Sequence, residues 1–132
     1  MNIALDTNTY SALQRGHAPQ LKDTVSNAEL VGFVFIVDAE LKASFKKSQN
    51  ERENYAKLLR FQLLDRVALL SADEQTNGLY AKLWAELEKN GTPIPTNAVW
   101  IAATCLQHQL ALTTSDKHLK SVPLPQTVPA DK

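Results

Sequence analysis

The stretch Pro93–Asp116, PIPTNAVWIAATCLQHQLALTTSD, predicts a helix that leads into a buried strand and then to an acid. Two prolines precede Asn97, which is expected to open the helix, and the apolar run behind it extends the helix to about Gln109. Leu110–Thr113 has the length and composition of a short strand, and Asp116 follows it closely. This segment therefore predicts one helix–strand unit with a carboxylate at the carboxyl end of its strand.

The remainder of the chain shows the same alternation of strands and helices. Short apolar runs predict three further strands, at residues 1–5, 30–37 and 67–70. Capping residues and amphipathic spacing predict helices between them, at residues 8–15, 19–28, 38–47, 50–64 and 71–90. Such alternation is typical of a three-layer α/β/α sandwich with a central parallel sheet of four to five strands. The proline-rich tail is either irregular or carries one short edge strand.

Apolar spacing also predicts which side chains face the core. In the helix at residues 50–64 the apolar side is expected to hold Tyr55, Leu58, Leu59 and Leu63. In the helix at residues 71–90 it is expected to hold Leu79, Tyr80, Leu83, Trp84 and Leu87. The stripe around Trp84 is either core or an oligomer surface. The single cysteine, Cys105, lies in an apolar helical run and is interpreted as a small core residue.

Length and composition point to one domain that spans residues 1–132. The chain has 132 residues and 44% apolar content, the range of a globular domain with one core. The 14 basic and 14 acidic residues cancel, which excludes a strongly basic nucleic-acid binder but leaves room for a local basic patch. No signal peptide and no membrane span are recognisable, so we expect a cytoplasmic protein without a membrane partner.

Three acids follow predicted strands from distant parts of the chain. Asp6 directly follows the first strand, Glu40 lies in the first turn of the helix after the second, and Asp116 follows the last. Ligands of parallel sheets bind beyond the carboxyl ends of the strands. Like charges gathered there favour a divalent cation with oxygen ligands. Taken singly, each acid also has a plain structural reading, as a helix cap, a partner of the helix dipole or a turn residue.

Neutral and basic groups surround these acids in the sequence. Hydrogen-bonding side chains that would orient carboxylates around a metal, or serve as local caps, are Thr7, Asn8, Asn97, Thr114 and Ser115. A loose basic cluster past Glu40 is either a solvated face or a set of candidate RNA contacts, and it consists of Lys42, Lys46, Lys47 and Arg52. The three histidines show no metal-binding spacing.

Four motifs, in order, resemble those of the PIN-domain ribonucleases and more narrowly of the VapC toxins. They are LDTN at Leu5–Asn8, AEL at Ala39–Leu41, GTPIPTN-x-x-WIAA at Gly91–Ala103 and TTSD at Thr113–Asp116. Together they span nearly the whole chain, at the usual size of the family. The first and third motifs in combination are specific, whereas either one alone would be weak. The resemblance implies a PIN-like fold.

The resemblance also implies an activity and partners. The activity is that of an endoribonuclease toxin that uses Mg²⁺ or Mn²⁺ to polarise a phosphodiester and activate water. By analogy Asp6 and Asp116 hold the metal, and Glu40 is a third catalytic acid. The implied partners are a VapB-type antitoxin that covers the site, a second copy in a homodimer, and an RNA substrate. Transfer, ribosomal and messenger RNA remain open as substrates, with transfer RNA favoured by family.

Ala98 departs from the family pattern. The family has an aspartate after the asparagine of this motif, as a principal metal ligand, whereas here Asn97 is followed by Ala98. A methyl group cannot coordinate a hard cation, so we expect an impaired metal site. Either a natural degenerate copy or a deliberate replacement of aspartate by alanine would produce this sequence.

Other functions remain open at this stage. Ala98 favours a non-catalytic PIN-like module that only holds antitoxin or RNA. A phosphohydrolase with Asp6 as nucleophile is a weaker reading, because the second acid that haloacid-dehalogenase sites place two residues on is replaced by Asn8. A response-regulator receiver also fits poorly, since its paired N-terminal acids and its lysine are not correctly placed.

Overall fold

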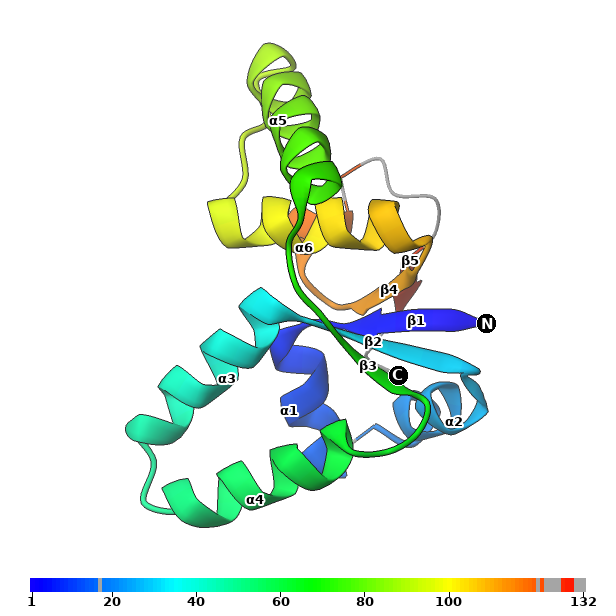
Figure 1. Cartoon of the computed structure of the whole chain (residues 1–132), viewed down its shortest axis with the longest axis vertical. Coiled ribbons are helices and arrows are strands. Elements are labelled where there is room, and N and C mark those ends of the chain that lie inside the picture. Colours follow the sequence, from blue (N-terminus) through cyan, green and yellow to red (C-terminus); the bar gives the residue numbers. More distant parts are fainter. Residues whose placement is uncertain (17, 121, 123–126, 130–132) are drawn as a thin grey trace.

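The protein is built around a five-stranded parallel sheet, shown in the computed structural model of Figure 1. The structure describes residues 1–16, 18–120, 122 and 127–129. Neighbouring strands are all parallel, in the order β3-β2-β1-β4-β5. The strands are β1 (Asn2–Leu5), β2 (Leu30–Val34), β3 (Val67–Leu70), β4 (Ala111–Thr114) and β5 (Thr127–Pro129). The predicted parallel sheet is confirmed, and β5 is the edge strand anticipated in the tail.

Helices cover both faces of this sheet. Below it in Figure 1 lie α1 (Thr7–Arg15), α2 (Pro19–Asn27), α3 (Phe35–Lys46) and α4 (Glu51–Gln62). Above it lie α5 (Glu74–Lys89) and α6 (Thr96–His108), and the short α7 (Lys117–Lys120) follows β4. Right-handed crossovers explain this division, because the chain moves across the sheet one way from β1 to β3 and returns to β4 the other way. The three-layer prediction is confirmed.

The second predicted strand is too long. Leu30–Val37 was expected to be one strand, but β2 ends at Val34 and α3 begins at Phe35 rather than after Asp38. A continuous apolar run does not distinguish a buried strand from the first turn of a buried helix. The helical reading is visible in the spacing of four between the buried residues of α3, which are Val37, Leu41 and Phe45. Glu40 therefore lies in the second turn of α3, not the first.

The apolar side predicted for α4 is only partly buried. Leu58 is 1% exposed, as expected, but Leu59 is 56% and Leu63 is 71% exposed. Leu58 and Leu59 are consecutive, so they point to different faces of α4, and only one of these faces is buried; Leu63 comes just after the last residue of the helix. Two further large apolar side chains on this part of the surface, Leu64 and Leu69, are also exposed.

The start of α5 and its packing on α6 also differ in detail from expectation. Asp73, not Ser71, caps α5, in a reciprocal capping box with Thr76. Gln107 of α6 donates a hydrogen bond to Asp73 Oδ1 at 2.9 Å, so the cap also ties the two helices together. Hydrogen bonds from the Thr76 backbone and from Gln107 lower the pKa of Asp73, although desolvation opposes them.

Aromatic residues show which face of α5 is buried. Tyr80 stacks on Trp100 of α6 with ring centroids 4.1 Å apart, and Trp100 contacts Phe35 of α3 edge-on. Leu83 and Leu87 are buried on the same side of the helix. Trp84 is 48% exposed, so its predicted place on the core face is wrong, and its role in an oligomer surface stays a prediction. In the part of the chain that is described, no helix is both long and apolar enough to cross a membrane.

Gly78 is an exposed glycine within α5, and its replacement by alanine is expected to stabilise the protein. A Cβ built there meets no heavy atom within 4 Å. Alanine has the higher helix propensity, so we expect the free energy of unfolding to rise by about 0.5–1 kcal/mol in urea titrations. Gly91→Ala is the control: its Cβ site is equally open, but its φ of +69° is left-handed, so the same change there is expected to destabilise. A loss of stability in Gly78→Ala would contradict this account of α5.

Candidate functional site

A pocket of about 320 Å³ opens at the carboxyl ends of β1 and β4, where α1, α3 and α6 converge. In Figure 1 the start of α6 and the whole of α3 both lie at the left-hand end of the sheet, α6 above it and α3 below it. The side chains that line the pocket come from five segments and are Asp6, Thr7, Asn8, Glu40, Pro95, Asn97, Ala98, Ile101, Asp116 and Leu119. The structure thus brings together the three predicted acids and the position of the missing one.

Asp6 links the end of β1 to the start of α1. It is the N-cap of α1, with Oδ1 accepting the Thr9 N–H at 2.9 Å, and it is 5% exposed. Oδ2 accepts a hydrogen bond from the Thr114 hydroxyl of β4. The capping role and the pocket role are therefore both present in one residue. Each carboxylate oxygen accepts one of these bonds and retains a further lone pair.

Glu40 is held from both sides by neutral donors. Its Oε1 accepts a hydrogen bond from the Thr7 hydroxyl of α1, and its Oε2 accepts one from Asn97 Nδ2 of α6 at 3.0 Å. Thr7 and Asn97 therefore both orient the Glu40 carboxylate, which is the role that the sequence predicts for them. Because Glu40 lies in the second turn of α3, the helix dipole does not account for its position.

Asp116 follows β4 and adjoins α7. Its Oδ1 accepts the His118 N–H at 2.8 Å, and its own N–H donates to Thr114 Oγ1 at 2.9 Å. Thr114 thus connects the two acids, donating to Asp6 and accepting from Asp116. Ser115 is exposed and is not among the lining residues of the pocket.

Ala98 presents its methyl group to the same pocket. It is the third residue of α6 and 7% exposed. Three lining residues, Pro95, Ile101 and Leu119, were not foreseen. Ile101 follows Ala98 by three positions, so helical spacing alone placed both on one face. The other two come from a loop and from α7, for which the sequence offers no such signal.

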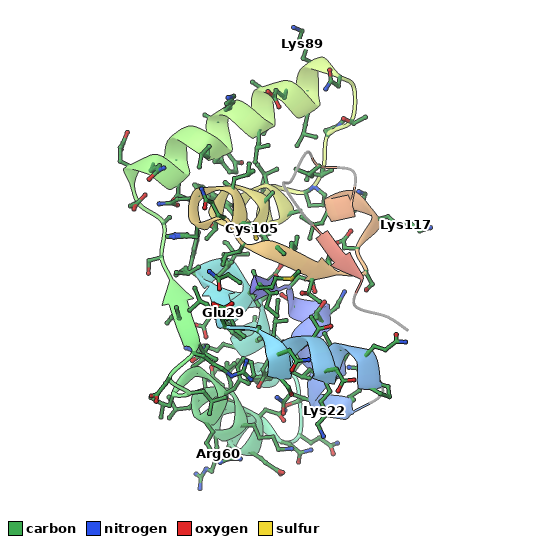
Figure 2. All side chains as sticks on the ribbon, turned by 90° about the vertical axis from the view of Figure 1, so that its right-hand side faces the viewer. Lys22, Glu29, Arg60, Lys89, Cys105 and Lys117 are labelled. Carbon is green, nitrogen blue, oxygen red and sulfur yellow. The ribbon has the colours of Figure 1, made fainter. Side chains whose placement is uncertain are left out.

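The pocket carries negative charge that no described cation neutralises. Within the described residues Asp6, Glu40 and Asp116 form no ion pair. Cys105 lies inside the molecule on α6, as Figure 2 shows. Burial, and to a smaller degree the negative charge of the Asp6 carboxylate, raises the pKa of its thiol to about 12. The thiol therefore stays protonated, and the prediction of a core cysteine is confirmed.

The donor set fits a hard divalent cation in kind but lacks a ligand. All the charged groups are carboxylates, the oxygen donors that Mg²⁺ and Mn²⁺ prefer. Among residues 1–16, 18–120, 122 and 127–129, however, no three Asp, Glu, His or Cys side chains lie close enough to one another to hold a metal ion. A carboxylate at position 98 would enter this same pocket, so the gap in the donor set coincides with Ala98.

The predicted basic cluster on α3 and α4 is partly neutralised. Lys42 pairs with Asp38 at 2.9 Å, and Lys46 pairs with Glu51 at 2.7 Å. Lys47 and Arg52 are exposed. None of the four lines the pocket, and their role as RNA contacts stays a prediction.

The sequence profile of the PIN domain matches residues 3–124, nearly the whole chain. The chain belongs to the PIN-domain family. This PIN domain is 27% identical to ribonuclease VapC4 of Mycobacterium tuberculosis over 92 residues, which cover 70% of this chain and 71% of that protein.

Two solved structures match the PIN domain along almost its full length. One is VapBC2 from Rickettsia felis, bound to a DNA fragment from its promoter, with 25% identity, a TM-score of 0.82 and 98% of each chain covered. The other is VapBC-1 from nontypeable Haemophilus influenzae, with 28% identity, a TM-score of 0.78, and 96% of this chain and 98% of that one covered. The family resemblance noted in the sequence is confirmed.

Thr114→Val is expected to destabilise the PIN domain by about 1–3 kcal/mol, because the buried Asp6 carboxylate loses its hydroxyl donor. Valine keeps the shape and the β-propensity of threonine, so urea titration would report the lost hydrogen bond. Thr24→Val, which removes a hydroxyl near the surface of α2, is the matched control and is expected to cost under about 0.5 kcal/mol. Equal losses in the two variants would mean that Asp6 does not depend on Thr114.

Proposed function

We propose that this PIN domain is a metal-dependent endoribonuclease toxin of the VapC kind, and that Ala98 weakens its metal centre. The observation that carries the proposal is the convergence of Asp6, Glu40, Asp116 and position 98 on one pocket at the carboxyl edge of the sheet. Three acids to which the described residues supply no ion-pair partner are unfavourable neighbours, and a cation between them would relieve their repulsion. The ribonuclease VapC4, similar over 70% of this chain, supports RNA as the substrate class.

In the proposed mechanism the acids of the pocket have different roles. Asp6 and Asp116 would hold Mg²⁺ or Mn²⁺, with their remaining lone pairs directed by Thr9, Thr114 and the backbone of His118. When bound, such a cation polarises a phosphodiester and activates water for in-line attack. Glu40, fixed by its two donors, is placed to accept a hydrogen bond from the attacking water.

Ala98→Asp should restore what the pocket lacks. Without metal, the variant is expected to be less stable than the unsubstituted chain, because a further carboxylate joins like charges. With Mg²⁺ or Mn²⁺ its melting temperature should rise by several degrees, since a ligand present at 100 times its Kd stabilises by about 2.7 kcal/mol. RNA cleavage should appear with the same cations, measured on transfer, ribosomal and messenger RNA.

Ala85→Asp is the matched control for this experiment. It adds the same carboxylate to an exposed position of α5, away from the pocket. It should gain neither cleavage nor a metal-dependent melting temperature. An Ala98→Asp protein that binds no cation and cuts none of the three RNA classes would overturn the proposed ribonuclease.

A second candidate function is a non-catalytic module that holds antitoxin or RNA. Ala98 itself favours it, together with the absence of a three-ligand cluster in the described chain. Metal titration of the unsubstituted chain and of Ala98→Asp separates the two: a binding module shows RNA or antitoxin affinity in both proteins and cleavage in neither.

We further propose that the chain pairs with a VapB-type antitoxin and forms a homodimer. The similar structures are VapBC pairs, which supports the antitoxin. Large exposed apolar side chains support a second copy, since Trp84, Leu59 and Leu63 are each about half or more exposed. Light scattering of the purified chain should give the mass of a dimer, and Trp84→Lys or Leu63→Lys should shift it toward the monomer. A monomer mass for the unsubstituted chain would contradict the homodimer.

A further inference from the structure

A second pocket lies beside the catalytic one, between α1, α3 and α4. Its volume is about 300 Å³, and we call it the Tyr10 pocket. Its lining includes Tyr10, Ser11, Arg15, Ser44, Ser48 and Lys57. None of the described residues that line it is acidic, and two of them are cationic. Its charge is therefore opposite to that of the catalytic pocket.

Tyr10 contributes a buried hydroxyl that has no partner. The residue is 2% exposed, and in the described part of the chain nothing bonds to its OH. Edge contacts with Phe33 and Phe61, at centroid distances of 5.7 and 5.5 Å, fix the ring. Burial raises the pKa of Tyr10 to about 12, so the hydroxyl remains a proton donor. A buried unpaired donor is unfavourable, and a ligand that accepts its hydrogen bond would relieve it.

The other polar groups of the pocket narrow the chemistry of that ligand. Ser44 and Ser48 already donate their hydroxyl protons to the carbonyls of Leu41 and Phe45. Arg15 forms no ion pair with any described residue, and Lys57 has only an exposed contact of 3.4 Å with Glu53. Asn54 donates to Ser48 Oγ, and the Gln14 amide is neutral, so the groups that set the charge of the pocket are the Arg15 guanidinium and the Lys57 ammonium, with the Tyr10 hydroxyl beside them. All three donate hydrogen bonds and two are positive, a combination that selects an oxyanion.

The two pockets follow each other along the same pair of helices, α1 and α3. Thr7 and Asn8 of α1 and Glu40 of α3 line the catalytic pocket, and Ser11 and Ser44, four residues after Thr7 and Glu40, line the Tyr10 pocket. Four to seven residues of helix correspond to about 6–11 Å. A chain of linked phosphates that enters the catalytic pocket therefore needs to continue by one or two units to reach the Tyr10 pocket.

We propose that the Tyr10 pocket binds a backbone phosphate of the RNA strand whose scissile bond lies in the catalytic pocket, through Arg15, Lys57 and the Tyr10 hydroxyl. This assignment rests on the proposed ribonuclease function and adds a substrate subsite to it. It also answers an electrostatic need. The catalytic pocket repels phosphates with three acids, and Lys42 and Lys46 are already paired, so the attraction for RNA has to come from other cations nearby.

The subsite can be tested by RNA binding without cleavage, because this chain already carries Ala98. A fluorescently labelled single-stranded RNA is titrated with protein in EDTA over a range of NaCl concentrations. The double variant Arg15→Gln/Lys57→Gln should bind every RNA sequence more weakly and to a similar degree. The slope of log affinity against log salt should become shallower by about 0.7–1, as expected for one lost phosphate contact.

The matched control removes the same charge elsewhere. Lys82→Gln/Lys89→Gln takes two cations from exposed positions of α5, across the sheet from the Tyr10 pocket, and Figure 2 shows Lys89 at the far end of that helix. This control should keep the affinity and the salt slope of the unsubstituted chain. Equal effects in both double variants would overturn the subsite, because they would reflect net charge alone.

Tyr10→Phe isolates the hydroxyl. No hydrogen bond within the described fold is lost, so the melting temperature should stay the same or rise. RNA affinity should nevertheless fall, by a smaller factor than in the cationic double variant. Unchanged RNA affinity in a folded Tyr10→Phe protein would overturn the assignment of the hydroxyl to the phosphate.

Three further outcomes distinguish the subsite from the function on which it rests. If Ala98→Asp cleaves RNA but the Arg15/Lys57 changes leave both RNA affinity and KM unaltered on that background, the subsite fails and the ribonuclease stands. If a Glu-rich peptide, and not RNA, loses affinity in the double variant, the pocket serves an acidic protein partner and the proposal is overturned. If the unsubstituted chain binds no RNA, the subsite is wrong. The proposed ribonuclease function is then also wrong if Ala98→Asp does not cleave RNA, and it stands if Ala98→Asp does. A raised KM with kcat unchanged supports the subsite.

Discussion

The buried carboxylate of Asp6 is the constraint on which the rest of the arrangement depends. It ends the central strand β1, caps α1 through the Thr9 N–H and accepts a hydrogen bond from Thr114 of β4. One charged group thus sets the start of a helix and joins two neighbouring strands beneath the pocket. A charge at such a depth is tolerated because two hydrogen-bond donors face it, the Thr9 N–H and the Thr114 hydroxyl.

The two pockets along α1 and α3 carry opposite charges, and we call the line between these helices the seam. At the sheet end of the seam Asp6 and Glu40 make the surface negative, and one to two turns further Arg15 and Lys57 make it positive. A polyanion cannot be held by the first region alone, and a divalent cation has no ligand in the second. In the function that we propose, the two regions are complementary parts of one RNA-binding surface, whose metal-binding half is short of a carboxylate at Ala98.

Sequence patterns predicted the layers of the fold and the pocket better than they predicted the boundaries of the elements and the hydrogen-bond partners. The alternation of strands and helices determined the sheet, and the rule that parallel strands end at one edge brought Asp6 and Asp116 together. The start of α3 was missed because an apolar run such as Leu30–Val37 is equally consistent with either element. The two hydrogen bonds that hold Glu40, from Thr7 and Asn97, were not predicted. They join three helices, and the angles at which helices pack cannot be read from the spacing of residues in the sequence.

The hydrogen bond from Thr114 to Asp6 spans 108 positions of the chain, and β1 has β4 as one of its two neighbours. Strand β1 is synthesised well before β4, so the long-range pairing between them must await the synthesis of β4. An unfinished nascent polypeptide lacks one wall of the pocket altogether. The order of synthesis therefore delays the assembly of this pocket until β4 has been made.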